Sequence, residues 1–182
     1  ARAQRNDREG WQQRWMWPVT GRISGVYGSQ RILGGEPADP HYGVDIARPT
    51  GTPIVAPADG VVVLAGPPRF SLEGNLLIID HGMGVNSAYL HLCRIDVTEG
   101  QKVRRGQLVG AIGTTGRSTG PHLHWGVNWG KVRIDPALLG AVSALACVSI
   151  SSRVRRIARS SLSVMRGTVK EVPSAWTTIQ VA

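Results

Sequence analysis

The five histidines are the residues of this sequence best suited to chemistry, and all of them lie between positions 41 and 124 of the 182-residue chain. Two of them belong to the motif His122-Leu123-His124. Successive side chains of a β-strand point to opposite faces, so a strand here places both imidazoles on one face, about 7 Å apart. The motif therefore indicates a functional site built on a strand.

Two further segments carry groups that complement this pair. His41 and Asp45 flank Gly43, which lets the backbone bend so that the imidazole and the carboxylate can converge on one point. His91 lies on another predicted strand and shares a face with Tyr89. A catalytic zinc site takes three nitrogen or oxygen ligands from the protein and leaves a fourth position for water. Two histidines and an aspartate would complete such a site if these segments meet in space.

Three residues near these motifs are expected to have other roles. His81 follows Asp80 at the end of a predicted strand, so we expect it to be structural or to support the site indirectly. Trp129 is expected to be half-buried by packing. Tyr89 fits core packing and stacking on a substrate equally well.

Glycine and proline indicate which elements must position these side chains. The chain has 23 Gly and 11 Pro but one Phe, which is typical of short strands joined by many turns. Their spacing predicts a mainly β fold, an antiparallel β-sheet sandwich or open barrel with a short N-terminal arm. The histidine and aspartate motifs add the expectation of a metal groove in this fold. No apolar run is long enough for a transmembrane segment. The expected strands cover residues 22–27, 43–47, 53–56, 61–65, 76–80, 85–92, 108–112, 122–128 and 132–134.

Composition divides the chain into an expected N-terminal arm at 1–16, a main domain at 17–140 and a basic tail at 141–182. Only one of the 23 glycines lies beyond residue 140. Residues 1–140 hold 15 basic and 11 acidic residues, net +4, whereas 141–182 hold 6 and 1, net +5. The indoles of Trp11, Trp15 and Trp17, just before Pro18, are expected to pack back on the domain.

The overall charge of +9 suits an anionic partner, but its distribution limits the candidates. The main domain has no basic stripe with interleaved aromatic residues, so no specific nucleic-acid binding is expected there. The tail is expected to be a solvated extension, and the alternative is a contact with an anionic surface or a nucleic acid. Its densest basic cluster consists of Arg153, Arg155, Arg156 and Arg159.

From about Trp17 to Leu139 the chain resembles the lysostaphin/LytM-type zinc metalloendopeptidases, which cleave peptide bridges of bacterial peptidoglycan. The resemblance covers roughly two-thirds of the sequence, and its blocks occur in the family's order. These blocks are WPVTGRIS from Trp17, HYGVDIA from His41, GTPIVA from Gly51, DGVV from Asp59, GNLLIIDHG from Gly74, YLHL from Tyr89, GQKVRRGQLVG from Gly100 and GRSTGPHLHW from Gly116.

The resemblance implies roles for five residues. Carried over position by position, it implies that His41, Asp45 and His124 are zinc ligands and that His91 and His122 are unligated catalytic histidines. The implied reaction is hydrolysis of a peptidoglycan peptide by a zinc-activated water. A D-alanyl cross-link is expected rather than a glycine bridge, because no glycine-bridge specificity is visible in the sequence. One histidine would take the water's proton, and the other would polarise the carbonyl or protonate the leaving amine.

The main alternative is a non-catalytic cell-wall-binding or hydrolase-activating module of the same fold. The complete set of ligands and histidines favours the enzyme over this module. A peptidoglycan substrate implies an extracytoplasmic location, in the cell envelope or periplasm, with the export signal outside this chain.

Overall fold

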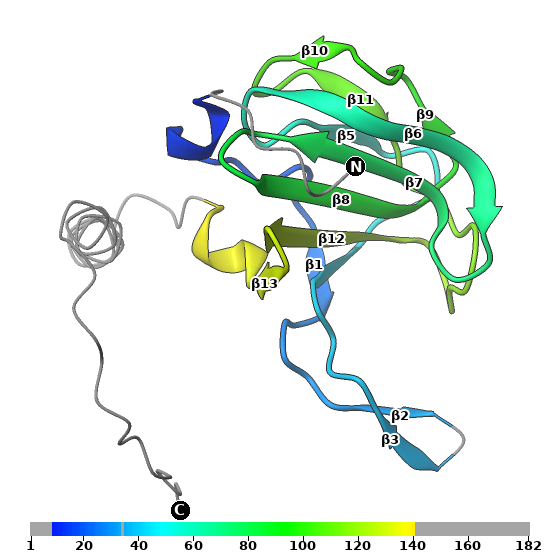
Figure 1. Cartoon of the computed structure of the whole chain (residues 1–182). Helices are drawn as coiled ribbons and strands as arrows, with labels where there is room; N and C mark the ends of the chain where they lie inside the picture. Colours follow the sequence, from blue (N-terminus) through cyan, green and yellow to red (C-terminus); the bar gives the residue numbers. More distant parts are fainter. Residues whose placement is uncertain (1–8, 34, 141–182) are drawn as a thin grey trace, which may run out of the picture. The chain divides into compact units, whose positions relative to one another are not determined.

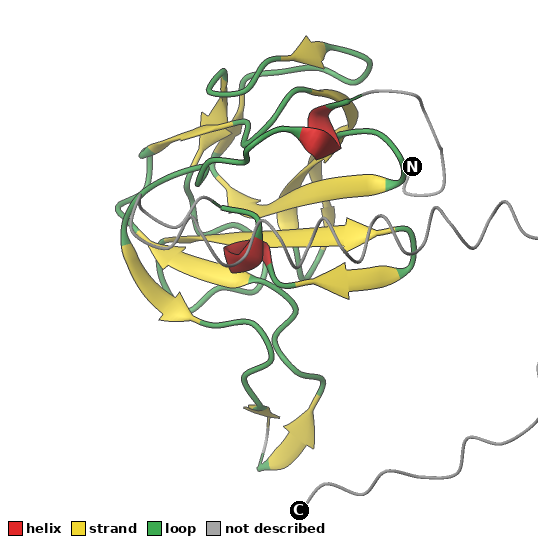
Figure 2. Cartoon of the chain, turned by 90° about the vertical axis from the view of Figure 1, so that its left-hand side faces the viewer, coloured by secondary structure: helices red, strands yellow, loops and turns green. Residues whose placement is uncertain are grey.

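The computed structural model describes residues 9–33 and 35–140, and the expectations for the first eight residues and for the tail at 141–182 lie outside this part. Strands dominate it, with two single turns of 3-10 helix (Figures 1 and 2). None of its helices is long and apolar enough to cross a membrane. The elements are η1 (Gly10–Gln12), β1 (Arg22–Gly25), β2 (Arg31–Leu33), β3 (Glu36–Ala38), β4 (Val44–Ala47), β5 (Pro53–Val55), β6 (Gly60–Phe70), β7 (Gly74–Asp80), β8 (Val85–Leu92), β9 (Arg94–Ile95), β10 (Lys102–Val103), β11 (Leu108–Ala111), β12 (His122–Trp129), β13 (Val132–Ile134) and η2 (Pro136–Leu138).

An eight-stranded antiparallel sheet is the larger layer of the fold (Figure 1). Its strands follow the order β1-β4-β12-β8-β7-β6-β10, and β13 pairs with β12. Along β12, Leu123, Trp125 and Val127 belong to the hydrophobic core, whereas His122 and His124 alternate onto the opposite face. The strand predicted for the two histidines is therefore confirmed, and it has one core face and one site face.

A three-stranded antiparallel sheet, ordered β5-β11-β9, shares its core with the large sheet. One hydrophobic cluster contains Ile54 of β5 and Val109 of β11 together with Ile46, Leu77 and Leu123 of the large sheet. Within the described residues neither sheet closes on itself, so the predicted antiparallel, mainly β fold is confirmed and is not a closed barrel.

The segment before β1 packs on the domain. The indole of Trp15 is 2% exposed, and its ring lies 4.5 Å from the imidazole of His81, centroid to centroid. The backbone N–H of Trp11 donates to the backbone carbonyl of His81 at 2.9 Å. The backbone N–H of Met16 donates to the carbonyl of Pro57 at 3.0 Å. The expectation that a tryptophan of the arm packs back on the domain is confirmed for Trp15.

Four short strands were not expected from the sequence: β2, β3, β9 and β10. Two or three residues are too few to show an alternating pattern, and β3 also contains Pro37, which weakens a strand signal. β2 and β3 pair in a hairpin that projects from the large sheet beside β1 (Figures 1 and 2).

Candidate metal centre and active site

His41 is held in place by the segment that follows β1. Its backbone N–H donates to the carbonyl of Ser29 at 2.9 Å, and its backbone carbonyl accepts from the N–H of Gly28 at 2.8 Å. Its Nδ1 lies 3.0 Å from the carbonyl of Val26. A carbonyl can only accept, so Nδ1 carries the proton and a neutral ring presents a lone pair at Nε2.

Asp45 and His124 are directly opposite each other on the neighbouring strands β4 and β12. They are paired residues in the antiparallel register of β4 and β12, so their side chains emerge on the same face. His124 Nδ1 lies 2.8 Å from Asp45 Oδ1. His41 Nε2 lies 3.0 Å from the same oxygen and 3.0 Å from His124 Nδ1. The three predicted metal ligands therefore meet at one point.

These three groups fit a divalent cation. Together they offer two imidazole nitrogens and one carboxylate oxygen, a donor set that zinc accepts. Burial disfavours the charged carboxylate, but the imidazoles of His124 and His41 outweigh burial and hold the pKa of Asp45 well below its usual range. Gly25 gives the ligands room, because a Cβ there would lie 2.6 Å from Asp45 Oδ2 and 3.1 Å from His41 Cε1.

Two more imidazoles lie beside this cluster. The rings of His91 and His122 are 4.9 Å apart, centroid to centroid, and the His91 ring is 6.4 Å from that of His124. His122 Nε2 lies 3.9 Å from Asp45 Oδ1. His122 Nδ1 lies 2.8 Å from the carbonyl of Gly120, and His91 Nδ1 lies 2.8 Å from the carbonyl of Thr115. Both rings thus use Nδ1–H for the backbone and keep Nε2 for the site.

His91 reaches the site because of a bulge in β8. Leu90 and His91 together stand opposite the single residue Leu76 of β7, between the pairs formed by Leu92 and by Tyr89. His91 has φ +64°, so the strand turns its side chain onto the site face. The prediction that His91 shares a face with Tyr89 is wrong, because alternation is interrupted at the bulge.

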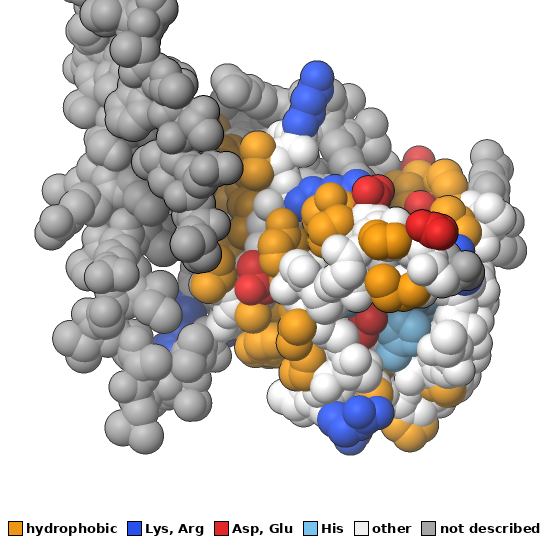
Figure 3. All heavy atoms as spheres, turned by 90° about the horizontal axis from the view of Figure 1, so that it is seen from below, with side chains coloured by type: hydrophobic (Ala, Val, Ile, Leu, Met, Phe, Trp, Pro, Cys, Tyr) orange, Lys and Arg blue, Asp and Glu red, His pale blue; other side chains and the backbone are white. Residues whose placement is uncertain are grey.

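The cluster is open on one side. Asp45, His122 and His124 have side chains that are 19%, 15% and 14% exposed. Figure 3 shows histidine side chains at the surface next to an acidic one. Burial is the main reason why the pKa of His91 lies below its usual value. The face combines a candidate cation site with the partly exposed imidazole of His122 and the buried imidazole of His91, which is an arrangement suited to hydrolysis.

The fifth histidine is separate from the cluster. His81 is fully buried, its Nδ1 donates to the carbonyl of Asp59 at 2.8 Å, and its Nε2 accepts from Ser87 Oγ at 2.7 Å. Ser87 Oγ in turn accepts from the Tyr89 hydroxyl at 2.8 Å. Burial lowers the pKa of His81 to about 4. Its structural role is confirmed, and Tyr89 is a core residue.

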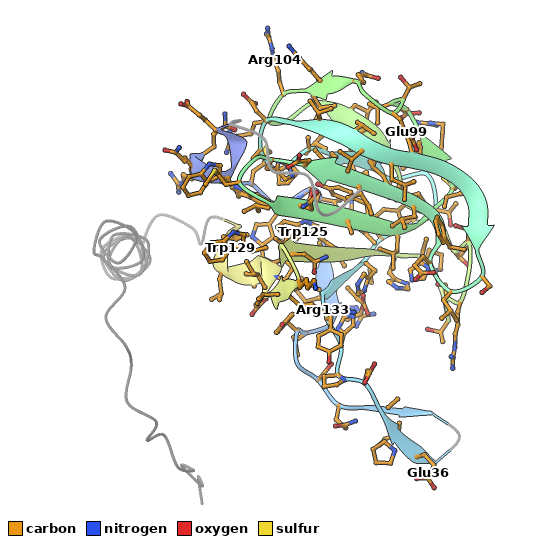
Figure 4. The ribbon with its side chains drawn as sticks, viewed as in Figure 1. Glu36, Glu99, Arg104, Trp125, Trp129 and Arg133 are labelled. Atoms are coloured by element: carbon orange, nitrogen blue, oxygen red, sulfur yellow. The ribbon has the colours of Figure 1, made fainter. Side chains whose placement is uncertain are left out.

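Trp129 is the last residue of β12. It lies on the same strand as Trp125, which is fully buried, yet Trp129 is 55% exposed (Figure 4). Its indole N–H donates to the carbonyl of Met83 at 3.1 Å. A little under half of its surface is therefore buried, so the expectation of half-buried packing is confirmed, although Trp129 is not one of the core residues.

Sequence reasoning missed several residues that shape the site. Gly25 gives space to the ligands, the carbonyl of Val26 orients His41, and Thr115 contacts His91. The only sequence signal for them is their place inside or near the blocks that begin at Trp17 and Gly116.

An antiparallel β scaffold that gathers a His-Asp-His cluster and two further imidazoles on an open face defines a protein of the metallopeptidase class. Comparison with known proteins makes this specific. The chain belongs to peptidase family M23, which it matches over residues 39–136.

Two curated relatives illustrate the similarity. The chain is 50% identical over 86 residues to the peptidoglycan DD-endopeptidase ShyA of Vibrio cholerae, which is 47% of this chain and 20% of that protein. It is 48% identical over 85 residues to the DD-carboxypeptidase/endopeptidase Mpg of Neisseria meningitidis, which is 47% of this chain and 19% of that protein. The chain thus spans about a fifth of the length of these relatives.

Two solved structures share the fold. A zinc-containing peptidase from Vibrio cholerae has a TM-score of 0.62 and 35% identity, over 68% of this chain and 39% of that one. The catalytic domain of lysostaphin from Staphylococcus simulans has a TM-score of 0.57 and 32% identity, over 64% of this chain and 90% of that domain.

Proposed function

We propose that this protein is a zinc-dependent endopeptidase that hydrolyses peptide cross-links of bacterial peptidoglycan. The observation that carries the proposal is the convergence of His41 Nε2, Asp45 Oδ1 and His124 Nδ1, within 3.0 Å of one another, beside two imidazoles that are not part of the cluster. Relatives named as peptidoglycan DD-endopeptidases support the substrate class and favour the D-alanyl cross-link.

His41, Asp45 and His124 would hold the metal, and His91 and His122 would remain outside its ligand set. When bound, zinc polarises a carbonyl oxygen and makes water a stronger nucleophile near neutral pH. The carboxylate of Asp45 stays ionised because its pKa is lowered, so it is available as a ligand over the neutral range.

The two remaining imidazoles handle protons and orient the scissile bond. In each ring the backbone carbonyl that accepts from Nδ1 leaves Nε2 able to accept or donate a proton. One ring takes the proton from the attacking water, and the other stabilises the carbonyl oxygen or protonates the departing amine. Such groups each contribute on the order of 10² to 10⁴ in rate.

The proposed substrate class implies a reaction outside the cytoplasm, in the cell envelope or periplasm. Peptidoglycan peptides are found there, and the relatives named for peptidoglycan cleavage support this location. The proposed partner is therefore the cell wall itself.

The test is digestion of purified peptidoglycan peptides, with and without a metal chelator, followed by mass analysis of the products. We expect cleavage at a D-alanyl cross-link that the chelator abolishes and added zinc restores. Product masses that correspond to a cut in a glycine bridge would show that the glycine bridge, and not the D-alanyl cross-link, is the bond that is cleaved. If the zinc-loaded protein binds peptidoglycan but does not cleave it, the proposed endopeptidase activity is wrong and the protein is a non-catalytic wall-binding module.

A further inference from the structure

His91 occupies a backbone conformation that side chains usually avoid. Its φ of +64° is left-handed, and within 9–33 and 35–140 the only other residue with a side chain at positive φ is Met83. Such a conformation is unfavourable for an L-residue and persists only where neighbouring contacts hold it. The contacts around His91 therefore decide whether its imidazole points to the site.

The bulge at His91 leaves a gap in the pairing of β7 with β8, and Thr115 fills that gap. The Thr115 hydroxyl accepts from the N–H of Asn75 at 3.0 Å and donates to the carbonyl of Leu92 at 2.9 Å. Asn75 Nδ2 donates to the same carbonyl at 2.8 Å. One side chain from the segment before β12 thus bridges the two strands beside the bulge.

The backbone of Thr115 also contacts His91 directly. Its carbonyl accepts from His91 Nδ1 at 2.8 Å, and its N–H donates to the carbonyl of His91 at 3.4 Å. The backbone N–H of His91 donates to the carbonyl of Glu73 at 2.9 Å. The main-chain groups of Thr115 therefore orient the ring, while its hydroxyl holds the strands that carry it.

The fit around Thr115 is tight. Gly74 has φ +69°, and a Cβ at this position would collide with the carbonyl and the hydroxyl of Thr115. A Cβ on Gly116 would collide with the backbone of Gly74. The threonine therefore has little freedom to move away from His91, as expected of a residue that holds another in place.

We propose that Thr115 is a positioning residue for His91: its hydroxyl closes the gap beside the bulge, and its carbonyl fixes the imidazole as the Nδ1–H tautomer with Nε2 toward the metal cluster. This inference rests on the proposed endopeptidase function. It adds a residue that lies outside the His-Asp-His cluster. Its effect on catalysis is exerted through His91.

Three variants separate positioning from general packing. Thr115→Val keeps the shape and removes the hydroxyl, Thr115→Ser keeps the hydroxyl, and Thr114→Val makes the same change at the exposed neighbour. Kinetics on a cross-linked peptidoglycan peptide would be measured with the zinc content and melting temperature of each variant. We expect Thr115→Val to lower kcat on the order of tenfold to a hundredfold with KM and zinc content nearly unchanged. We expect Thr115→Ser and Thr114→Val to stay within about threefold of the wild type.

A second measurement requires no variant and no activity. Nitrogen NMR of the histidine rings reports which nitrogen carries the proton, and we expect the Nδ1–H form for His91 in the wild-type protein at neutral pH. The Nε2–H form would overturn the proposal, as would an unchanged kcat in a folded Thr115→Val protein that otherwise cleaves. A wild type that fails to cleave would refute the endopeptidase function instead, and the NMR result would still show whether His91 is the Nδ1–H tautomer that its contact with the Thr115 carbonyl requires.

Discussion

Gly43 lies directly against the ring of His124. A Cβ at Gly43 would approach Cε1 and Nε2 of that ring to 2.6 Å each and the carbonyl of Trp125 to 2.8 Å. Gly43, between His41 and Asp45, is therefore important because it has no side chain. Sequence reasoning attributed Gly43 to backbone bending, and the structure shows that it makes room for the ring of His124.

Gly43→Ala is expected to weaken zinc binding on the order of tenfold to a hundredfold, because the added methyl group displaces the His124 ring. Competition with a chromophoric chelator measures the affinity. Gly66→Ala is the matched control, since a Cβ there meets nothing within 4 Å. Equal zinc affinity in the two variants would contradict the assignment of His124 as a ligand.

His122→Ala is expected to lower kcat by on the order of 10²- to 10⁴-fold while zinc content stays near that of the wild type. Its ring is close to Asp45 but outside the His-Asp-His cluster. His41→Ala is the comparison, and it is expected to lose both zinc and activity. Zinc loss in His122→Ala would instead identify His122 as a ligand.

The buried His81 predicts a dependence of stability on pH. Its pKa is about 4 in the folded chain against 6.5 for an unperturbed histidine, so between these values the unfolded chain takes up a proton that the folded chain does not. The free energy of unfolding therefore falls as the pH is lowered through this range, by about 3 kcal/mol at about 1.4 kcal/mol per pKa unit.

Urea unfolding of the metal-free protein between about pH 7 and pH 4 measures this loss. His81→Gln is the control, because glutamine does not titrate and the variant should lose about 3 kcal/mol less over the same range. If the free energy of unfolding falls equally with pH in both proteins, His81 is not the cause of the pH dependence. The other titrating groups are shared by both proteins and cancel in the comparison.

Trp15→Ala is expected to lower the free energy of unfolding by about 3 to 5 kcal/mol, because it removes a large side chain that is 2% exposed. Trp129→Ala is the comparison, and it removes an exposed indole with one hydrogen bond, for a loss of about 1 kcal/mol. Chemical denaturation measures both. A small loss for Trp15→Ala would mean that the residues before β1 are not part of the folded domain.

Much of the site follows from local pattern. His122 and His124 share a face because β12 is eight residues long and regular, and regular strands alternate. The strand from 122 to 128, expected from the sequence, differs from the observed β12 by one residue. The order of the blocks that carry the family resemblance similarly lies in the sequence and needs no coordinates.

The position of His91 could not be derived in this way. A bulge is a property of two paired strands, and it depends on how Leu76 of β7 aligns with β8. The contact of Thr115 with His91 joins residues 24 apart, and that of His41 with His124 joins residues 83 apart. Contacts between such distant positions depend on how the strands pair.

The sequence by itself determined which functional groups the chain offers, its strand-rich character and the shared face of the two histidines on β12. These depend on residue type and on nearest neighbours along the chain. Only the tertiary structure decided that His41, Asp45 and His124 meet, that His91 turns away from the core, and that Trp129 lies outside it. Strand register and bulges set these relationships, because they determine which distant residues become neighbours.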